Sequence, residues 1–171
     1  MSAPAFLIAL VAVARLAELV YATRNTRALL AQGGVEIGRN HYVMIVLLHA
    51  LWLASLWIFV PADAAISWPW LAVFVILQGL RVWVIASLGR FWTTRIVTLP
   101  GAPLVRRGPY RFVRHPNYLV VAGEILVLPL VFGAWRIALV FTLLNLAILA
   151  WRIRVEEQAL APRRAVHGTG S

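Results

Sequence analysis

Apolar residues are grouped into five long runs along the chain, with short polar stretches between them. The runs cover residues 5–23, 42–60, 68–88, 117–132 and 135–155, and the last one continues toward residue 160. Crossing a bilayer as a helix takes about 20 apolar residues, with a range of about 17–25. Backbone polar groups in lipid need partners within their own segment, which favours helices. The pattern predicts an all-α integral membrane bundle of about five transmembrane helices, of which the fourth is short.

Composition indicates a membrane protein of one domain. Of the 171 residues, 62% are hydrophobic, whereas soluble domains are about 45–50% apolar. We expect a single transmembrane domain over residues 1–165, with the chemistry-bearing motifs in its C-terminal half, residues 89–160. Residues 166–171 are expected to be a disordered tail or a cloning remnant.

The charges are unevenly placed. All 16 basic residues are arginine, and with 6 acidic residues the formal charge is +10. The arginines flank the apolar runs and gather in residues 23–41, 89–116 and 152–164. Basic loops set the orientation of a membrane protein and meet anionic lipid headgroups, so no nucleic-acid partner is expected. The pattern predicts that these three segments are cytoplasmic and that the N-terminus lies outside.

Two polar motifs lie at the ends of the last two runs. Residues 108–118 read G-P-Y-R-F-V-R-H-P-N-Y, and residues 152–157 read R-I-R-V-E-E. Such groups are costly in hydrocarbon unless they bind something polar. Only Gly133 and Ala134 join the fourth and fifth runs, which forces an antiparallel hairpin. The two motifs are therefore predicted to converge on one membrane face.

This convergence favours a site for a polar cofactor. Pro116 suits the start of a helix, where free N–H groups attract an anionic group. Arg152 and Glu156 are four residues apart and share a helix face. A zwitterion fits this arrangement, with its carboxylate toward the arginines and its hydroxyls or ammonium toward a glutamate. Cysteine is absent and no carboxylate lies at ligand spacing from the histidines, so no metal is expected.

The motifs resemble those of a known family. The first motif, followed by two helices and R-x-x-x-E-E, resembles the isoprenylcysteine carboxyl methyltransferase family of integral membrane methyltransferases over about residues 106–160. The related phosphatidylethanolamine N-methyltransferases share part of the pattern. The resemblance implies S-adenosylmethionine as methyl donor and a donor site in the C-terminal half. The residues assigned to that site are Gly108, Pro109, Tyr110, Arg111, Arg114, His115, Pro116, Tyr118, and Glu156 or Glu157.

The N-terminal half resembles a bacterial branch of this family. The resemblance rests on R-L-x-E-L at residues 15–19, on Arg24-Asn25, and on H-Y-x-x-x-x-L-L-H at residues 41–49. That branch occurs with type III polyketide synthases and is similar to enzymes that O-methylate long-chain alkylpyrones and alkylresorcinols. It implies a bacterial inner membrane and an active site facing the cytoplasm. The chain lacks the aromatic-rich tail of longer members, and loop 89–107 is the candidate to cover the cofactor instead.

The resulting prediction is an S-adenosylmethionine-dependent O-methyltransferase with a lipid-like acceptor that enters from the bilayer. The acceptor is an isoprenylcysteine-type carboxylate or the hydroxyl of an alkylpyrone or alkylresorcinol. The predicted catalytic residues are Arg152 and Glu156, and Arg152 is expected to orient an oxyanion because arginine stays charged in an apolar setting. The alternatives are a phospholipid N-methyltransferase and a non-enzymatic membrane scaffold or transporter. No obligate protein partner is expected.

Polar residues outside the motifs are further candidates. The predicted acceptor-site residues are Glu18, His49, Arg81 and Arg95. Three of them also have a structural interpretation. Arg15 and Glu18 are three residues apart and can neutralise each other, and His49 is more simply a satisfied structural histidine. Arg81 is expected either to reach the pocket or to extend to the interface.

Overall fold

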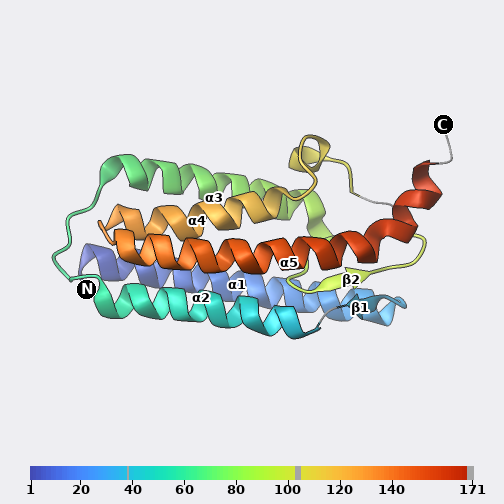
Figure 1. Ribbon diagram of the computed structural model, residues 1–171, viewed down its shortest axis with the longest axis horizontal. Coiled ribbons are helices and arrows are strands. Elements are labelled where there is room, and N and C mark those ends of the chain that lie inside the picture. The colour runs from blue at the N-terminus through green and yellow to red at the C-terminus, as the bar shows by residue number, and fades with distance from the viewer. Residues whose placement is uncertain (38, 103–104, 169–171) are drawn as a thin grey trace.

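A computed structural model of the chain has five α-helices in its described residues, and they lie side by side along one axis (Figure 1). The helices are α1 (Ala3–Ala31), α2 (Arg39–Phe59), α3 (Trp68–Leu88), α4 (Pro116–Val131) and α5 (Trp135–Gly168). Two short strands, β1 (Val35–Ile37) and β2 (Ile96–Thr98), and two 3-10 turns, η1 (Gly89–Phe91) and η2 (Gly108–Arg111), lie in the connections. The structure describes residues 1–37, 39–102 and 105–168, and for residues 39–41 and 159–168 it describes only the backbone.

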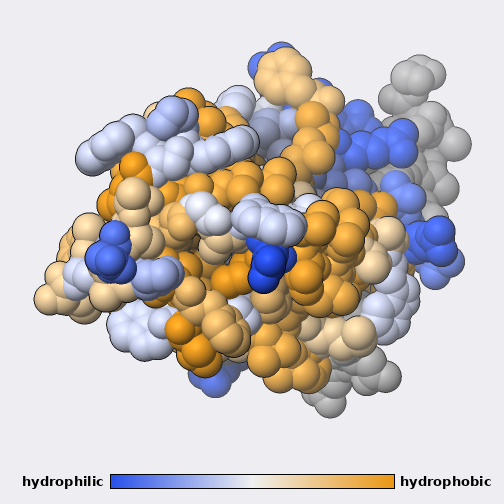
Figure 2. Space-filling view, turned by 60° about the vertical axis from the view of Figure 1, so that its left-hand side comes forward, coloured by the Kyte–Doolittle hydropathy of each residue, from blue (hydrophilic) through white to orange (hydrophobic). Residues whose placement is uncertain are grey.

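The protein is an integral membrane protein with an all-α bundle, as the sequence predicts. In the described part of the chain, four helices are long and apolar enough to cross a membrane, namely α1, α2, α3 and α5. Helix α4 is apolar but has only 16 residues. Large apolar side chains such as Leu51, Ile76 and Leu143 are exposed on the sides of the bundle. Figure 2 shows this apolar surface, with hydrophilic side chains gathered toward the right of the view.

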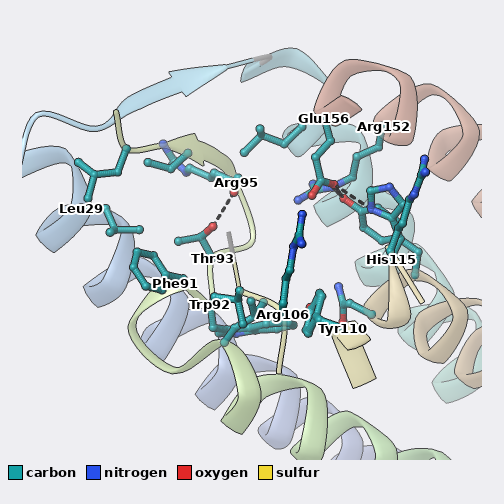
Figure 3. Close-up of a pocket in the computed structure, with 18 residues that line it drawn as sticks. Leu29, Phe91, Trp92, Thr93, Arg95, Arg106, Tyr110, His115, Arg152 and Glu156 are labelled. Carbon is teal, nitrogen blue, oxygen red and sulfur yellow. Dashed lines mark hydrogen bonds and ion pairs between the residues drawn. The ribbon is translucent and has the colours of Figure 1, made fainter. Parts of the chain in front are cut away.

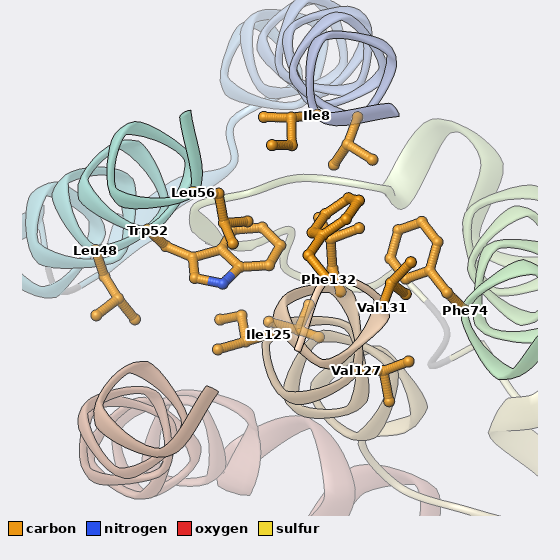
Figure 4. Close-up of a cluster of buried hydrophobic side chains, with 12 residues drawn as sticks. Ile8, Leu48, Trp52, Leu56, Phe74, Ile125, Val127, Val131 and Phe132 are labelled. Carbon is orange, nitrogen blue, oxygen red and sulfur yellow. The ribbon is translucent and has the colours of Figure 1, made fainter. Parts of the chain in front are cut away.

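The main core lies around α4, which is the most enclosed helix. Residues Ile125, Leu128 and Val131 of α4 are at most 1% exposed, and they pack with residues from α1, α2 and α3 in one cluster (Figure 4). Trp52 of α2 supplies the largest buried side chain of the cluster. A helix shorter than a full span is thus shielded from lipid by its longer neighbours.

The connections between the helices lie at two opposite ends of the bundle. The N-terminus, the α2–α3 connection and the α4–α5 turn lie at one end (Figure 1). We call the other end the pocket end. It contains the α1–α2 connection with β1, the α3–α4 connection with η1, β2 and η2, and the last turns of α5. Gly133, with φ of +69°, forms the tight turn between α4 and α5. The predicted hairpin is therefore present, and both sequence motifs lie at the pocket end.

A group of charged side chains lies inside the bundle, between the main core and a smaller apolar cluster nearer the pocket end. Arg15 Nη1 lies 3.2 Å from Glu18 of the same helix and 3.3 Å from Glu124 of α4. Arg81 of α3 lies 2.6 Å from Glu18 and 2.7 Å from Glu124. Gln78 donates to Glu124 and accepts from Arg15, at 2.7 and 2.9 Å. We call Arg15, Glu18, Arg81 and Glu124 the charge ring, because each cation contacts both carboxylates.

Three features at the pocket end differ from the sequence prediction. Helix α1 continues to Ala31, eight residues beyond the predicted apolar run, because Thr26 and Leu29 still face the interior and are at most 5% exposed. Strands β1 and β2 pair antiparallel, with Val35 opposite Thr98 and Ile37 opposite Ile96. These strands lie in segments predicted as loops. Helix α5 extends to Gly168, and residues 169–171 of the predicted tail lie outside the described residues.

Candidate active site

A cavity of about 460 Å³ opens at the pocket end, between the two sequence motifs and the α3–α4 connection (Figure 3). Ligand pockets for small molecules commonly have about 300–1,000 Å³. The first motif contributes Tyr110, Arg114, His115, Asn117 and Tyr118, and α5 contributes Arg152 and Glu156. The α3–α4 connection contributes Phe91, Trp92, Thr93, Arg95, Ile96, Val97, Leu99, Val105 and Arg106, and Leu29 and Leu88 complete the lining.

Tyr118 joins the two motifs at the centre of the site. Its hydroxyl donates to the Glu156 carboxylate and accepts from Arg152 Nε at 2.8 Å. Arg152 Nη2 also donates to the carbonyl of Thr94 at 2.7 Å, and its guanidinium lies 5.6 Å from the centre of the Tyr118 ring. Arg152 is only 7% exposed. The cation is therefore held in a fixed position between α4, α5 and the α3–α4 connection.

His115 lies against this group and has unused hydrogen-bonding capacity. Its ring stacks on Tyr118 with centroids 5.3 Å apart, and Nδ1 lies 3.8 Å from Glu156. Within the described part of the chain, His115 Nε2 and Asn117 Oδ1 are buried without a hydrogen-bond partner. Buried polar atoms are nearly always paired in native structures. Both residues line the pocket, so these atoms are available to a polar ligand.

Tyr110 of η2 faces the same cavity. Burial raises the pKa of its phenol well above the ordinary value, and the nearby Glu156 carboxylate raises it further. The phenol is therefore neutral at physiological pH, and its ring supplies a flat surface next to the charged groups.

The N-terminal half holds the opposite wall of the pocket. Asn25 of α1 donates through Nδ2 to the carbonyls of Gly89 and Trp92, at 3.1 and 2.9 Å. Arg95 forms an ion pair with Glu36 of β1 at 3.0 Å, so β1 and β2 are linked by side chains as well as by backbone. Loop 89–107 supplies half of the lining.

Several residues assigned to the donor site lie beside the cavity rather than in its lining. Gly108 has φ of +57°, and a Cβ there would lie 2.1 Å from Ser87 Oγ, so only glycine allows η2 to pack on α3. Pro109 is buried within η2, Pro116 is buried at the start of α4, and Arg111 is exposed. Glu157 lies 3.7 Å from His115 Nε2, outside the lining.

Of the acceptor-site candidates, the structure brings only Arg95 to the pocket. Glu18 and Arg81 belong to the charge ring, so Arg81 neither reaches the pocket nor extends to the interface. His49 hydrogen-bonds through Nδ1 to the carbonyl of Ile45 at 2.8 Å and meets Trp52 edge to face. That arrangement fits the structural interpretation of His49.

Sequence reasoning did not identify the apolar half of the lining. Several apolar lining residues lie in an apolar run or in a loop and belong to no motif, namely Leu29, Leu88, Ile96, Val97 and Leu99. Trp92 is the lining residue that the sequence could have indicated, because a tryptophan in an arginine-rich loop next to a span suggests a packed or ligand-facing ring. Its indole Nε1 is buried without a hydrogen-bond partner among the described residues.

Comparison with known proteins defines the class of this protein. The model of the isoprenylcysteine carboxyl methyltransferase (ICMT) family matches residues 70–162, more than half of the chain. The uncharacterized protein YpbQ of Bacillus subtilis (strain 168) is 40% identical over 159 residues, which cover 90% of this chain and 94% of YpbQ. An uncharacterized protein of Haemophilus influenzae (strain Rd) is 30% identical, with 86% of this chain and 88% of that protein covered. No solved structure matches.

The chain therefore belongs to the isoprenylcysteine carboxyl methyltransferase family, a family of membrane methyltransferases. Use of S-adenosylmethionine is a general property of this family. The matched region contains α3 from residue 70 on, all of α4 and all of the described side chains of α5, whereas α1, α2 and β1 precede it. Both sequence motifs lie in the matched region, and the two relatives are bacterial.

Proposed function

We propose that this chain transfers a methyl group from S-adenosylmethionine to an oxygen atom of a lipid-like acceptor. The observation that supports the proposal most directly is the meeting of Tyr118, Arg152 and Glu156 in one pocket, with His115 stacked beside them. The bound donor supplies an electrophilic methyl carbon next to a positive sulfur. The chain must hold this donor, orient the acceptor and exclude water.

The residues present fit the polar groups of the donor. The Glu156 carboxylate can accept hydrogen bonds from an ammonium or from ribose hydroxyls. The arginines of the lining suit a carboxylate. His115 Nε2 and Asn117 Oδ1 have no hydrogen-bond partner among the described residues and can bind further polar atoms. The faces of Tyr110 and Trp92 suit an adenine ring. We assign the donor to the end of the pocket formed by the first motif and α5.

Arg152 is the proposed orienting residue for the acceptor. It keeps its charge in an apolar setting, and its hydrogen bonds to Tyr118 and Thr94 hold the guanidinium in place. A carboxylate acceptor has a reference pKa of about 4 and needs no strong general base, and an acidic enol is largely ionised as well. The chain therefore has to position the oxygen, and too strong a contact in the ground state would slow transfer.

The acceptor is proposed to carry a long apolar tail. The pocket lining also includes the apolar side chains of Leu29, Leu88, Ile96 and Leu99, which suit hydrocarbon rather than a charged headgroup. The surrounding cations are arginines, which favour an anionic oxygen over a lipid amine. The two proposed acceptor classes are an isoprenylcysteine-type carboxylate and the hydroxyl of a long-chain alkylpyrone or alkylresorcinol. The site would face the cytoplasm from a bacterial inner membrane.

Donor binding can be tested by calorimetry with S-adenosylhomocysteine on purified protein in detergent. We expect His115→Ala and Glu156→Gln each to weaken binding by about tenfold or more, because the first removes a polar partner of the ligand and the second removes the negative charge that would face an ammonium. Glu157→Gln is the neighbouring comparison and should have a smaller effect, since Glu157 lies outside the lining. Asp63→Asn, in the α2–α3 connection at the other end of the bundle from the pocket, is the neutral control. Unchanged affinity in folded His115→Ala and Glu156→Gln would refute the donor site.

The acceptor class can be tested with labelled donor and three separate acceptors. These are an alkylpyrone or alkylresorcinol, a farnesylated cysteine analogue, and phosphatidylethanolamine. Label in the first or the second supports the O-methyltransferase proposal and selects between its two acceptor classes. Label in phosphatidylethanolamine alone would favour the phospholipid N-methyltransferase. Label in none of them, together with no donor binding, would favour a non-enzymatic scaffold or transporter.

A further inference from the structure

A short segment at the pocket end projects from the side of the bundle. This segment, residues 106–114, contains η2, and we call it the η2 corner. Figure 1 shows it standing out beyond α3 and α4. At its tip, Phe112 is 78% exposed and Val113 is 40% exposed. The four arginines of the segment, Arg106, Arg107, Arg111 and Arg114, are also exposed, and the segment contains no acidic residue.

The exposed tip is held on a rigid base. The backbone N–H groups of Phe112 and Val113 both donate to the carbonyl of Pro109, at 3.1 Å. Arg107 Nε donates to the carbonyl of Ser87 at 2.8 Å, and Gly108 is in close contact with the same residue. The corner therefore presents Phe112 in a fixed direction, and its exposure is not the result of a loop without contacts.

The height of the corner along the bundle places it at a membrane surface. Ser87 belongs to the last turn of α3, a helix with the length and apolar character of a membrane span. The end of such a helix marks the boundary between hydrocarbon and headgroups. A segment that projects sideways from this boundary runs into the headgroup layer, where aromatic side chains lie at the acyl boundary and arginines meet lipid phosphates.

We infer that the η2 corner binds anionic phospholipid, with Phe112 inserted at the acyl boundary and the surrounding arginines on the headgroup phosphates. The complementarity is both apolar and electrostatic, because one apolar tip is bordered by Arg106, Arg107 and Arg111. The fourth arginine, Arg114, also lies 3.9 Å from Glu157 of α5. The corner also contributes Arg106, Tyr110 and Arg114 to the pocket lining. Bound lipid would therefore hold one wall of the pocket in place. This inference does not depend on the proposed methyl transfer.

The absence of cysteine from the sequence allows a direct test. Phe112→Cys carries a single thiol for a fluorescent bimane label, and Val113→Cys gives a second position. The labelled protein is reconstituted in vesicles of phosphatidylcholine alone and of phosphatidylcholine mixed with phosphatidylglycerol. A lipid with a nitroxide near the top of its acyl chain reports contact by quenching. Neither donor nor acceptor is needed, so the result is separate from that of the methyltransferase assays.

We expect the label at residue 112 to emit at shorter wavelength and to be quenched by the nitroxide lipid. The quenching should increase with phosphatidylglycerol and fall again at high salt, because phosphate contacts by arginine are screened. Phe59→Cys is the matched control, as Phe59 is 70% exposed near the opposite end of the bundle. Its label should be quenched equally in both vesicles. Asp63→Cys, in the exposed α2–α3 connection, should be quenched in neither.

Three results would overturn the inference. A label at residue 112 without quenching would place the corner in water. Equal quenching with and without phosphatidylglycerol would exclude recognition of the anionic headgroup. Protection of the thiol that depends on protein concentration rather than on lipid would assign the corner to a contact with a second copy of the chain.

Discussion

Arg81 on α3 holds Glu18 on α1 with two nitrogens of its guanidinium group, Nε at 2.8 Å from one carboxylate oxygen and Nη2 at 2.6 Å from the other. Its third nitrogen, Nη1, lies 2.7 Å from Glu124 on α4. Because hydrocarbon does not solvate charge, each of these groups would be costly alone. The contact joins α1, which precedes the region that the family model matches, to two helices within that region.

Loss of one cation from the charge ring is expected to be strongly destabilising. Arg81→Met leaves Glu18 and Glu124 with only Arg15 between them, and an uncompensated buried charge costs about 3–5 kcal/mol. The double variant Arg81→Met with Glu124→Gln removes one charge of each sign and should recover part of that loss. Thermal unfolding in detergent measures both effects. Arg136→Met, at an exposed position, is the control, and equal stability of Arg81→Met and wild type would contradict a supporting role for the ring.

The spacing of the ring residues was visible in the sequence, but their partners were not. Arg15 and Glu18 form an i,i+3 pair, and so do Gln78 and Arg81. Local spacing indicates which residues share a helix face, yet it does not give the rotation of one helix against another. The same limit applies to β1 and β2, whose three-residue strands pair across about 60 positions of sequence without a hydropathy signal.

The hairpin of α4 and α5 shows where sequence reasoning succeeds. A link of two residues leaves only one arrangement for two long helices, and the meeting of Tyr118 with Arg152 follows from it. Most of the apolar lining could not be predicted, because residues such as Leu29 and Val97 look like any other apolar residue until the fold places them.

We predict that the pocket end faces the cytoplasm and that the N-terminus lies outside. All arginines except Arg15, Arg81 and Arg136 belong to segments at the pocket end, which is 13 of 16, and such a bias sets orientation in the inner membrane. Reporter fusions at Asp63 and after Leu160 should give opposite answers. Identical answers at the two positions would mean an even number of crossings and would contradict the predicted topology.

The amide of Asn25 is predicted to support the pocket through the backbone of η1. Asn25→Asp keeps the shape but removes both donors and places a carboxylate against the carbonyls of Gly89 and Trp92. Each lost hydrogen bond is worth about 0.5–1.5 kcal/mol, so binding of S-adenosylhomocysteine should weaken by roughly fivefold or more. Gln32→Glu is the matched control on the same helix, because its exposed amide donates to one carbonyl of its own helix. An equal change in both variants would speak against a specific role for Asn25.

Tyr110 is predicted to stay protonated for as long as the protein is folded. Burial, and then the nearby Glu156, raise its pKa above the ordinary value of about 10. A group with a raised pKa stabilises the fold fully below its ordinary pKa, and this contribution is lost as the pH rises toward the folded value. Absorbance titration of tyrosinate should show that Tyr110→Phe removes a group that ionises late. Unfolding measured as a function of pH should show that the same variant loses less stability at alkaline pH. If Tyr110→Phe instead removes a group that titrates near pH 10, the pKa of Tyr110 is not raised.

Arg152 is expected to separate acceptor orientation from donor binding. In Arg152→Ala the hydroxyl of Tyr118 keeps its bond to Glu156, so affinity for S-adenosylhomocysteine should stay within a few-fold of wild type. Methyl transfer should fall by about a hundredfold or more, because a misplaced reacting group costs that much. Arg152→Lys tests the geometry, since a lysine keeps the charge but cannot reproduce the two directed contacts to Tyr118 and Thr94. It should therefore rescue only part of the activity. If Arg152→Ala instead loses the donor, the residue belongs to the donor site, and the proposed division of roles between Arg152 and Glu156 is wrong.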